Sequence, residues 1–192
     1  MEIRVCGPKD LIPEDAFVLN TTSGSKNYGK NLSPFYLGPV SLWGGYSSLN
    51  VENAWQFSKV YKEHLDDDMN PSKDWFEWAE KGWTSKWAYR YPMGKGKIPA
   101  YSYWNGEKLN YIESRKKVYC PLYYEALMKK GSLTVLRGLL SEHEQVWLWD
   151  FDGYDHHKLG MSLEDVLNYP KRKMGHAFVV AMALESDLCW ER

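Results

Sequence analysis

Residues 51–65 read V-E-N-A-W-Q-F-S-K-V-Y-K-E-H-L, and this stretch decides the first helix of the predicted fold. Asn50 precedes it as a residue type that caps helix N-termini, and Glu52 places a negative charge in the first turn, where the helix dipole favours it. The acidic run 66–68 and Asn70-Pro71 follow, and a proline disfavours helical backbone at the residue before it. We therefore predict one helix over residues 51–65.

Outward from this helix, apolar spacing and turn residues divide the chain into short elements. Ile3 and Val5 predict a strand, residues 37–46 a hairpin or tight turns, and residues 146–151 a buried strand. Further helices are predicted over 72–88, 122–129, 132–140 and 174–184 and after Ser162, with a loop or insertion over 92–110. The fold class is therefore predicted to be α+β, mainly helical, with small β elements, in one domain spanning residues 1–192.

The composition is that of a globular chain with many aromatic residues. Hydrophobic residues make up 44% and charged residues 26%, and the formal net charge of −1 argues against a protein that coats nucleic-acid phosphates. The chain has 10 Trp and 14 Tyr. Most such rings are packing groups, but in so large a set we expect at least one to line a pocket and stack on a planar base.

The cysteines indicate a reducing compartment. Cys6, Cys120 and Cys189 are isolated and odd in number, with neither metal-ligand spacing nor a disulfide framework. No apolar run approaches membrane-spanning length, and the first residues lack the apolar region of a signal peptide. We expect a cytoplasmic protein with no membrane partner, while the sequence leaves the oligomeric state open.

Four polar residues share one face of the predicted 51–65 helix. Each residue advances about 100° around a helix, which brings Glu52, Gln56, Lys59 and Glu63 together, with apolar residues largely opposite. Geometry alone favours an ordinary solvent face with helical charge pairing. The alternative is a face that lines an active site.

A second segment at the right distance favours the active-site alternative. Residues 32–36 read L-S-P-F-Y, Pro39-Val40 follow, and G-Y-S-S at 45–48 leads to Glu52, with Gln56 and Lys59 at offsets of four and three. This pattern resembles the NADAR superfamily of N-glycosidases. The resemblance spans residues 31–185 and is specific over 31–61. Weaker counterparts of later family landmarks are Trp87 with Arg90, Asp150 or Asp152, and residues 174–176.

The chain also departs from the NADAR pattern. Asn53 stands where the family has a histidine after the glutamate, and Leu49 and Asn50 are extra before Glu52. Residues 152–157 replace a glycine-rich asparagine motif. We interpret the chain as a divergent member.

The resemblance implies hydrolysis of an N-glycosidic bond in an ADP-ribose-like or nucleoside-derived substrate, either a small nucleotide or an ADP-ribosylated nucleic acid, without a cofactor. Glu52 would act as acid/base or stabilise positive charge at C1′, as a nearby carboxylate can. Lys59 would attack the same carbon, for which its amine must be neutral. The remaining site residues that the resemblance implies are Asp150 in the catalytic set and Phe35, Tyr36, Gln56, Trp87 and Arg90 in substrate binding, with Trp87 stacking on the base and Arg90 meeting phosphate.

Other candidates carry less weight. His156-His157 beside Asp152 and Asp155 invites a metal, but adjacent residues point apart, so a solvated loop is favoured and no metal is expected. His176 is read as a core histidine that could also line a cleft. Three other function classes stay open. They are a non-catalytic module that binds a nucleotide or ADP-ribose, a nucleic-acid-binding accessory protein that stacks bases on its aromatic residues, and a purely structural or interaction protein without a pocket.

Overall fold

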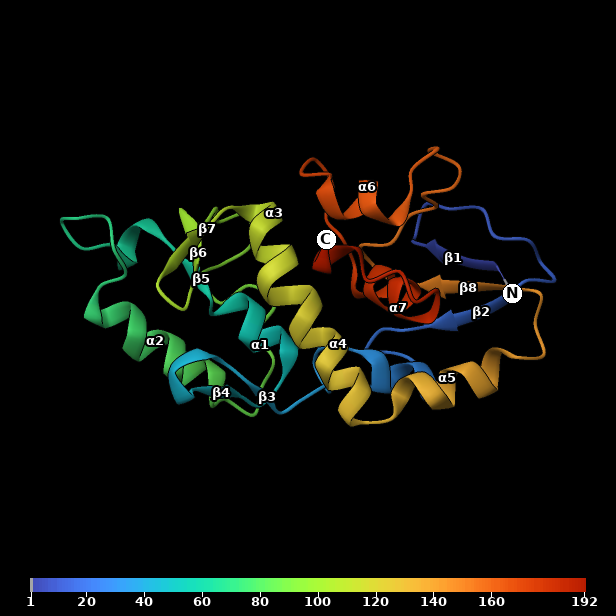
Figure 1. Ribbon diagram of the computed structural model, residues 1–192, viewed down its shortest axis with the longest axis horizontal. Coiled ribbons are helices and arrows are strands. Elements are labelled where there is room, and N and C mark those ends of the chain that lie inside the picture. The colour runs from blue at the N-terminus through green and yellow to red at the C-terminus, as the bar shows by residue number, and fades with distance from the viewer. Residues whose placement is uncertain (1) are drawn as a thin grey trace.

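The computed structural model describes residues 2–192 and shows an elongated molecule with two lobes (Figure 1). The sheet lobe holds strands β1, β2 and β8 with helices α5, α6 and α7, and the mixed lobe holds α1, α2 and strands β3 to β7. A helical run containing α3 and α4 crosses the middle and joins them. The predicted class, α+β and mainly helical, is confirmed.

The sheet lobe is built on three parallel strands. β8 (Gln145–Trp149) lies in the middle and pairs with β1 (Glu2–Cys6) on one side and β2 (Phe17–Asn20) on the other. Parallel strands buried on both faces are rich in apolar residues, as V-W-L-W in β8 illustrates. Helix α7 (His176–Leu184) packs on this sheet and is buried along almost its whole length, which its apolar, small-residue sequence permits. The carboxyl ends of all three strands therefore meet at one edge.

The remaining helices surround this core. The joining run consists of α3 (Tyr111–Ser114), a π-helical turn over Arg115–Tyr119 and α4 (Cys120–Lys129), with α5 (Ser132–Leu140) after it. A capping box of Asn110 and Glu113 begins the run, and a second one of Ser162 and Asp165 begins α6 (Leu163–Asn168).

The mixed lobe has a smaller core of its own. Helix α1 (Val51–Gln56) and α2 (Lys73–Trp83) pack beside the antiparallel sheet β5 (Lys59–Val60), β6 (Tyr101–Trp104) and β7 (Glu107–Leu109). The hairpin of β3 (Val40–Ser41) and β4 (Ser47–Ser48) lies where turns were predicted. Buried members of this core are Phe57, Val60, Trp75, Ala79 and Trp83.

The predicted 51–65 helix is wrong in its length. It ends at Gln56, and Lys59–Val60 pairs instead with β6. Ser58 donates its hydroxyl to the Trp55 carbonyl at 2.9 Å, a local bond that competes with the helical ladder. Extended pairing then buries Val60 in the second core. Tertiary packing therefore overrides a pattern that is helical by spacing alone.

Other boundaries also need correction. The predicted 72–88 helix ends at Trp83, the predicted 92–110 loop contains β6 and β7, and β2 lies in a part of the chain where no strand was predicted. The strands β1 and β8 and the helices α4 to α7 match their predictions to within two residues at either end, apart from α6, whose end was not predicted. Within residues 2–192, no helix is both long and apolar enough to cross a bilayer.

Candidate functional site

A cavity of about 790 Å³ lies between the two lobes, at the carboxyl edge of the parallel sheet. Thr22 and Ser23 after β2 and residues 150–152 after β8 form one side, with the start of α7 beside them. Helix α1, the π-helical turn and the segment between α2 and β6 form the other sides. In α/β proteins, ligands commonly bind outside the carboxyl ends of the strands, because loops and helix N-termini converge there.

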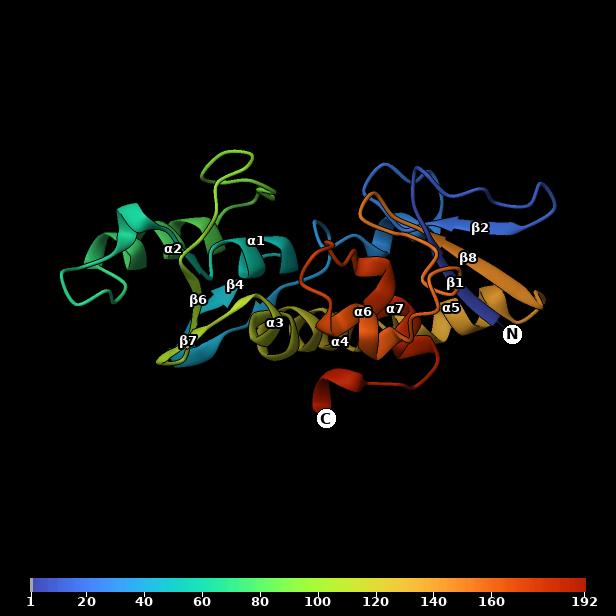
Figure 2. The same ribbon diagram turned by 90° about the horizontal axis from the view of Figure 1, so that it is seen from above.

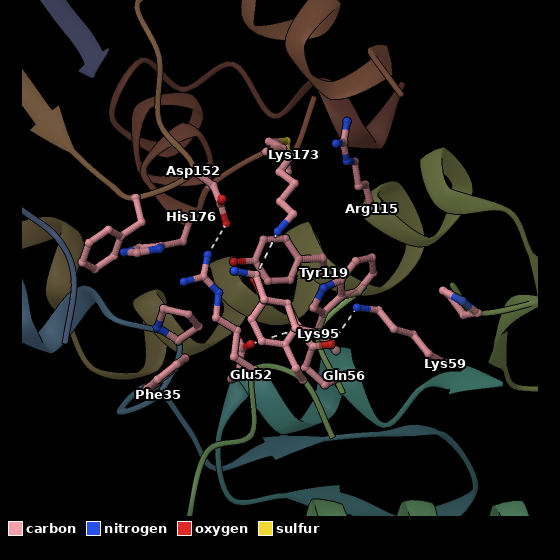
Figure 3. Close-up of a pocket in the computed structure, with 18 of the residues that line it drawn as sticks. Phe35, Glu52, Gln56, Lys59, Lys95, Arg115, Tyr119, Asp152, Lys173 and His176 are labelled. Atoms are coloured by element: carbon pink, nitrogen blue, oxygen red, sulfur yellow. Dashed lines mark hydrogen bonds and ion pairs between the residues drawn. The ribbon is translucent and has the colours of Figure 1, made fainter. Parts of the chain in front are cut away.

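Glu52, Gln56 and Lys59 form a hydrogen-bonded chain along one wall (Figure 3). The Gln56 amide Nε2 donates to Glu52 Oε1 at 2.9 Å, and Lys59 Nζ donates to Gln56 Oε1 at 2.7 Å. Glu52 and Gln56 are buried, and Lys59 is half-buried. The glutamine therefore keeps the carboxyl and the amine apart while orienting both.

Burial changes the proton affinity of both ends of this chain. It raises the pKa of Glu52 above its ordinary value, although Gln56 and Lys59 act in the opposite direction. It lowers the pKa of Lys59 to about 8, against the attraction of Glu52. The two shifts favour the protonated carboxyl and the neutral amine, which are the forms that acid catalysis and nucleophilic attack require.

Asp150 and His176 form a buried pair at the opposite wall. The distance from His176 Nδ1 to Asp150 Oδ2 is 2.9 Å, and the other ring nitrogen, Nε2, lies 2.8 Å from the Thr21 carbonyl. Both ring nitrogens therefore face acceptors, which indicates an imidazolium that donates twice. Asp150 also accepts backbone N–H bonds from Ala177 and Asp152 at 3.2 Å each.

The charges of this pair agree with its geometry. Burial opposes the ionisation of Asp150, but His176 and the backbone donors outweigh it and lower the pKa of Asp150 to about 2. Burial likewise favours a neutral His176, but Asp150 and the Thr21 carbonyl raise the pKa of His176 above its usual value. Every polar atom of Asp150 is engaged inside the protein, and the pair links β2, β8 and α7 at the edge of the cavity.

Aromatic rings surround Lys59. Its Nζ lies 4.8 Å from the ring centroid of Trp55, whose ring packs against Tyr119 at 5.2 Å and Tyr111 at 6.5 Å. All three rings line the cavity. Burial raises the pKa of Tyr119 well above its usual value, so its hydroxyl stays protonated. This aromatic wall offers a flat surface to a planar ring beside the amine.

The segment 84–100, which we call the lid, links α2 to β6 without regular structure and projects from the mixed lobe (Figure 2). Arg90, Tyr91 and residues 94–99 of the lid line the cavity. Arg90 on the lid pairs with Asp152 of the sheet lobe at 2.7 Å, and Lys173 Nζ lies 3.2 Å from the Tyr91 hydroxyl. Near its tip, Lys97 pairs with Glu63 at 2.9 Å. These contacts place several cations around the cavity mouth, where they suit an anionic ligand.

Comparison with known proteins gives a family. The model of a family of unknown function, DUF6939, matches residues 9–164. The chain belongs to the DUF6939 family. That match includes α1, the lid and β8, and so most of the cavity wall in this DUF6939 chain. No curated protein and no solved structure matches it.

The cavity unites most of the predicted site residues of the DUF6939 chain. Those that line it are Phe35, Glu52, Gln56, Lys59, Arg90 and Asp150. Tyr36 does not line it: its side chain is 48% exposed and lies under Lys30 Nζ, 5.1 Å from the ring centroid. Trp87 does not line it either: the residue is 76% exposed, and Asn53 and Ser85 hold only its backbone carbonyl and N–H.

Two further sequence interpretations are corrected. Glu63 lies outside the cavity, because the chain leaves the helix after Gln56 and Glu63 faces Lys97 instead. His156 is buried against Phe178 rather than solvated, while His157 is exposed. Within residues 2–192, no group of three His, Cys, Asp or Glu side chains could hold a metal.

Sequence reasoning missed several cavity residues of the DUF6939 chain. Trp55 was assigned to the apolar side of a long helix, and Tyr119, Arg115 and Lys173 carried no motif. The buried Arg115 donates to carbonyls at the end of α6 and to that of Arg172, and so holds the backbone that carries Lys173. A helical register drawn through residues 111–129 would have placed Arg115 and Tyr119 one turn apart on one face.

Proposed function

We propose that this protein is an N-glycosidase that hydrolyses the bond between C1′ of a ribosyl group and a nitrogen, in an ADP-ribose-like or nucleoside-derived substrate. The single observation that carries the proposal is the chain of Glu52, Gln56 and Lys59 inside the cavity. The resemblance of residues 31–61 to NADAR N-glycosidases supports the same chemistry.

The first step uses both ends of the chain. The lone pair of neutral Lys59 Nζ forms a bond to C1′, and the electron pair of the breaking C1′–N bond goes to the leaving nitrogen. Glu52 in its protonated form, which burial favours by raising its pKa, gives its proton to that nitrogen. Positive charge that develops at C1′ then faces the new carboxylate, which stabilises it.

The second step regenerates the free enzyme. The ammonium adduct passes one proton through water to O4′ as the C1′–O4′ bond breaks, so that the sugar ring opens and an iminium joins Lys59 to C1′. Water then adds to C1′ while the Glu52 carboxylate takes its proton. Cleavage of the bond between C1′ and Lys59 Nζ releases the free sugar aldehyde and the amine.

Substrate placement follows from the cavity walls. The aromatic wall of Trp55, Tyr111 and Tyr119 would stack on the leaving base, the role first given to Trp87. Arg90 and Lys173 at the mouth would meet phosphate, whose charge and geometry suit a guanidinium and an ammonium. The substrate is then a small nucleotide or an ADP-ribosylated nucleic acid. The three cysteines are free and buried, which supports a reducing, cytoplasmic setting.

The test uses Glu52→Gln and Lys59→Ala with ADP-ribosylated nucleotides and ADP-ribosylated DNA as substrates. We expect both variants to lose at least about a hundredfold in rate, because each removes a group that acts on the reacting atoms. The exposed residues Glu80 and Lys62 provide matched controls, as Glu80→Gln and Lys62→Ala. Parental rates in both site variants would refute the proposal.

Borohydride gives a second, independent readout. It reduces an iminium to a stable amine, so the parent treated during turnover should carry a sugar adduct on Lys59, located by mass spectrometry. Binding of ADP-ribose without turnover or adduct would instead favour a non-catalytic module that uses the same cavity.

A further inference from the structure

Asn53 follows Glu52 in α1, but its side chain points away from the cavity and is fully buried. Its Nδ2 donates to the carbonyls of Gly82 at 2.9 Å and Trp87 at 2.8 Å, and its Oδ1 accepts from the Tyr89 N–H at 2.9 Å. Both amide protons and the amide oxygen are thus used on the end of α2 and on the start of the lid. Buried polar groups that are fully satisfied in this way specify one arrangement of the backbone.

The segment that Asn53 holds leads directly to the mouth of the cavity. Tyr89 is followed by Arg90 and Tyr91, both of which line the cavity and contact the sheet lobe. The lid has no helix or strand of its own, so side-chain contacts fix its backbone. The contacts of Tyr91 and Lys97 are exposed and that of Arg90 is partly buried, whereas the Asn53 residue that holds the base of the lid is itself fully buried.

We propose that Asn53 is a positioning residue that couples the lid to the helix carrying Glu52. Glu52 presents its carboxyl to the cavity, and Asn53, the next residue of α1, fixes the backbone that leads to Arg90 and Tyr91 at the same cavity. The carboxyl and the cations at the mouth are therefore held in one geometry. The consequence for substrate rests on the proposed function, but the coupling itself does not.

The side-chain amide is the group that this position requires. Aspartate has the same shape but offers only acceptors, so it would face the carbonyls of Gly82 and Trp87 with no proton to donate. Alanine removes the partner of the Trp87 carbonyl and of the Tyr89 N–H, while the Gly82 carbonyl keeps its bond from the Ser85 N–H. Histidine keeps one donor and one acceptor and so restores part of the coupling.

Hydrogen–deuterium exchange of the whole, ligand-free chain tests the coupling. In Asn53→Asp we expect the peptides covering the lid to exchange on the order of tenfold faster, because two neutral hydrogen bonds are lost. Peptides of β1 and β8 should keep their parental rates. Asn31, which is exposed in the sheet lobe, provides the matched control as Asn31→Asp. Parental lid exchange in folded Asn53→Asp would overturn the proposal.

A milder variant covers the case in which Asn53→Asp fails to fold. Asn53→His should exchange its lid at a rate between those of the parent and a fully uncoupled lid, about threefold faster than the parent. Lid exchange at the parental rate in this folded variant would overturn the proposal equally.

ADP-ribose as a probe separates positioning from mere stability. In the parent, saturating ADP-ribose should slow lid exchange, and in Asn53→His this protection should fall and the Kd should rise about threefold to tenfold. An asparagine with only a structural role would change the melting temperature and leave ligand protection of the lid intact. If the parent does not bind ADP-ribose, the proposed function fails, while the ligand-free exchange rates still decide the role of Asn53.

Discussion

Replacement of Glu52 by glutamine should lower the pKa of Lys59 below its present value of about 8. Burial lowers this pKa, and the negative charge of Glu52 partly restores it. Glutamine removes the charge but keeps an oxygen for the bond from Gln56 Nε2, so the wall of the cavity is preserved. The amine then loses its stabilising anion while it stays buried.

The lowered pKa of Lys59 in the parent decides what fraction of its amine is neutral and can attack a carbon. An amine with a pKa of about 8 is neutral in about a quarter of molecules at about pH 7.5. An ordinary lysine, with a pKa of about 10.5, is neutral in about one molecule in a thousand. The cavity therefore supplies roughly two hundred times more nucleophile, before any substrate binds.

Competitive acetylation with trace acetic anhydride measures this directly, since only neutral amines react. The modified fraction of Lys59 is read by peptide mass spectrometry between about pH 6 and 11, with exposed Lys62 as an internal reference on the same segment. We expect a midpoint near 8 in the parent and a lower one in Glu52→Gln. A parental midpoint near that of an ordinary lysine, or a rise in Glu52→Gln, would refute the reasoning.

Three further predictions concern the walls of the cavity and the packing of the helices. Asp150→Asn should cost about 3–5 kcal/mol in urea unfolding, because it leaves a buried imidazolium without its counterion. The stabilisation that the Asp150–His176 pair provides in the parent should be greatest between about pH 4 and 6.5. It should fall as pH drops toward 2 through the lowered pKa of Asp150, and as pH rises through the raised pKa of His176. A difference in stability between parent and variant that does not change with pH would contradict this. Gly82→Ala should destabilise by at least about 1–3 kcal/mol in thermal unfolding, since its Cβ would lie 2.1 Å from the Phe57 ring, whereas Gly138→Ala, with open space in α5, should stabilise by about 0.5–1 kcal/mol. Trp55→Ala should weaken ADP-ribose binding about threefold to tenfold by calorimetry while Trp87→Ala leaves it unchanged, and equal losses in both would contradict the aromatic wall.

Much of the fold is predictable because it rests on local signals. The buried run V-W-L-W of β8, the cap at Ser162 and the apolar α7 each carry their signal within a few residues. The 51–65 stretch shows where such reasoning fails. Its polar residues keep a helical spacing, but Val60 gains more from β6 and a core of tryptophans that lie distant in sequence. No local pattern contains that information.

Some features of the candidate site were likewise predictable from the sequence and others were not. The offsets from Glu52 to Gln56 and Lys59 predicted a cluster, and the structure brings the three together although Lys59 is not on the helix. Two residues predicted to bind substrate, Tyr36 and Trp87, lie outside the cavity, because the direction in which a ring points in a loop depends on contacts that only the folded chain supplies. The role of Asp150 likewise depends on His176, and no spacing relates the two.

The order of strands in the parallel sheet has a consequence for how the protein is made. β1 and β2 do not pair with each other. Each pairs with β8 (Gln145–Trp149), which is synthesised long after them. The strand pairs of the mixed lobe, by contrast, lie between Val40 and Leu109 and can form before β8 is synthesised. The wall that carries Asp150 and His176 is therefore completed last, and the cavity closes only near the end of synthesis.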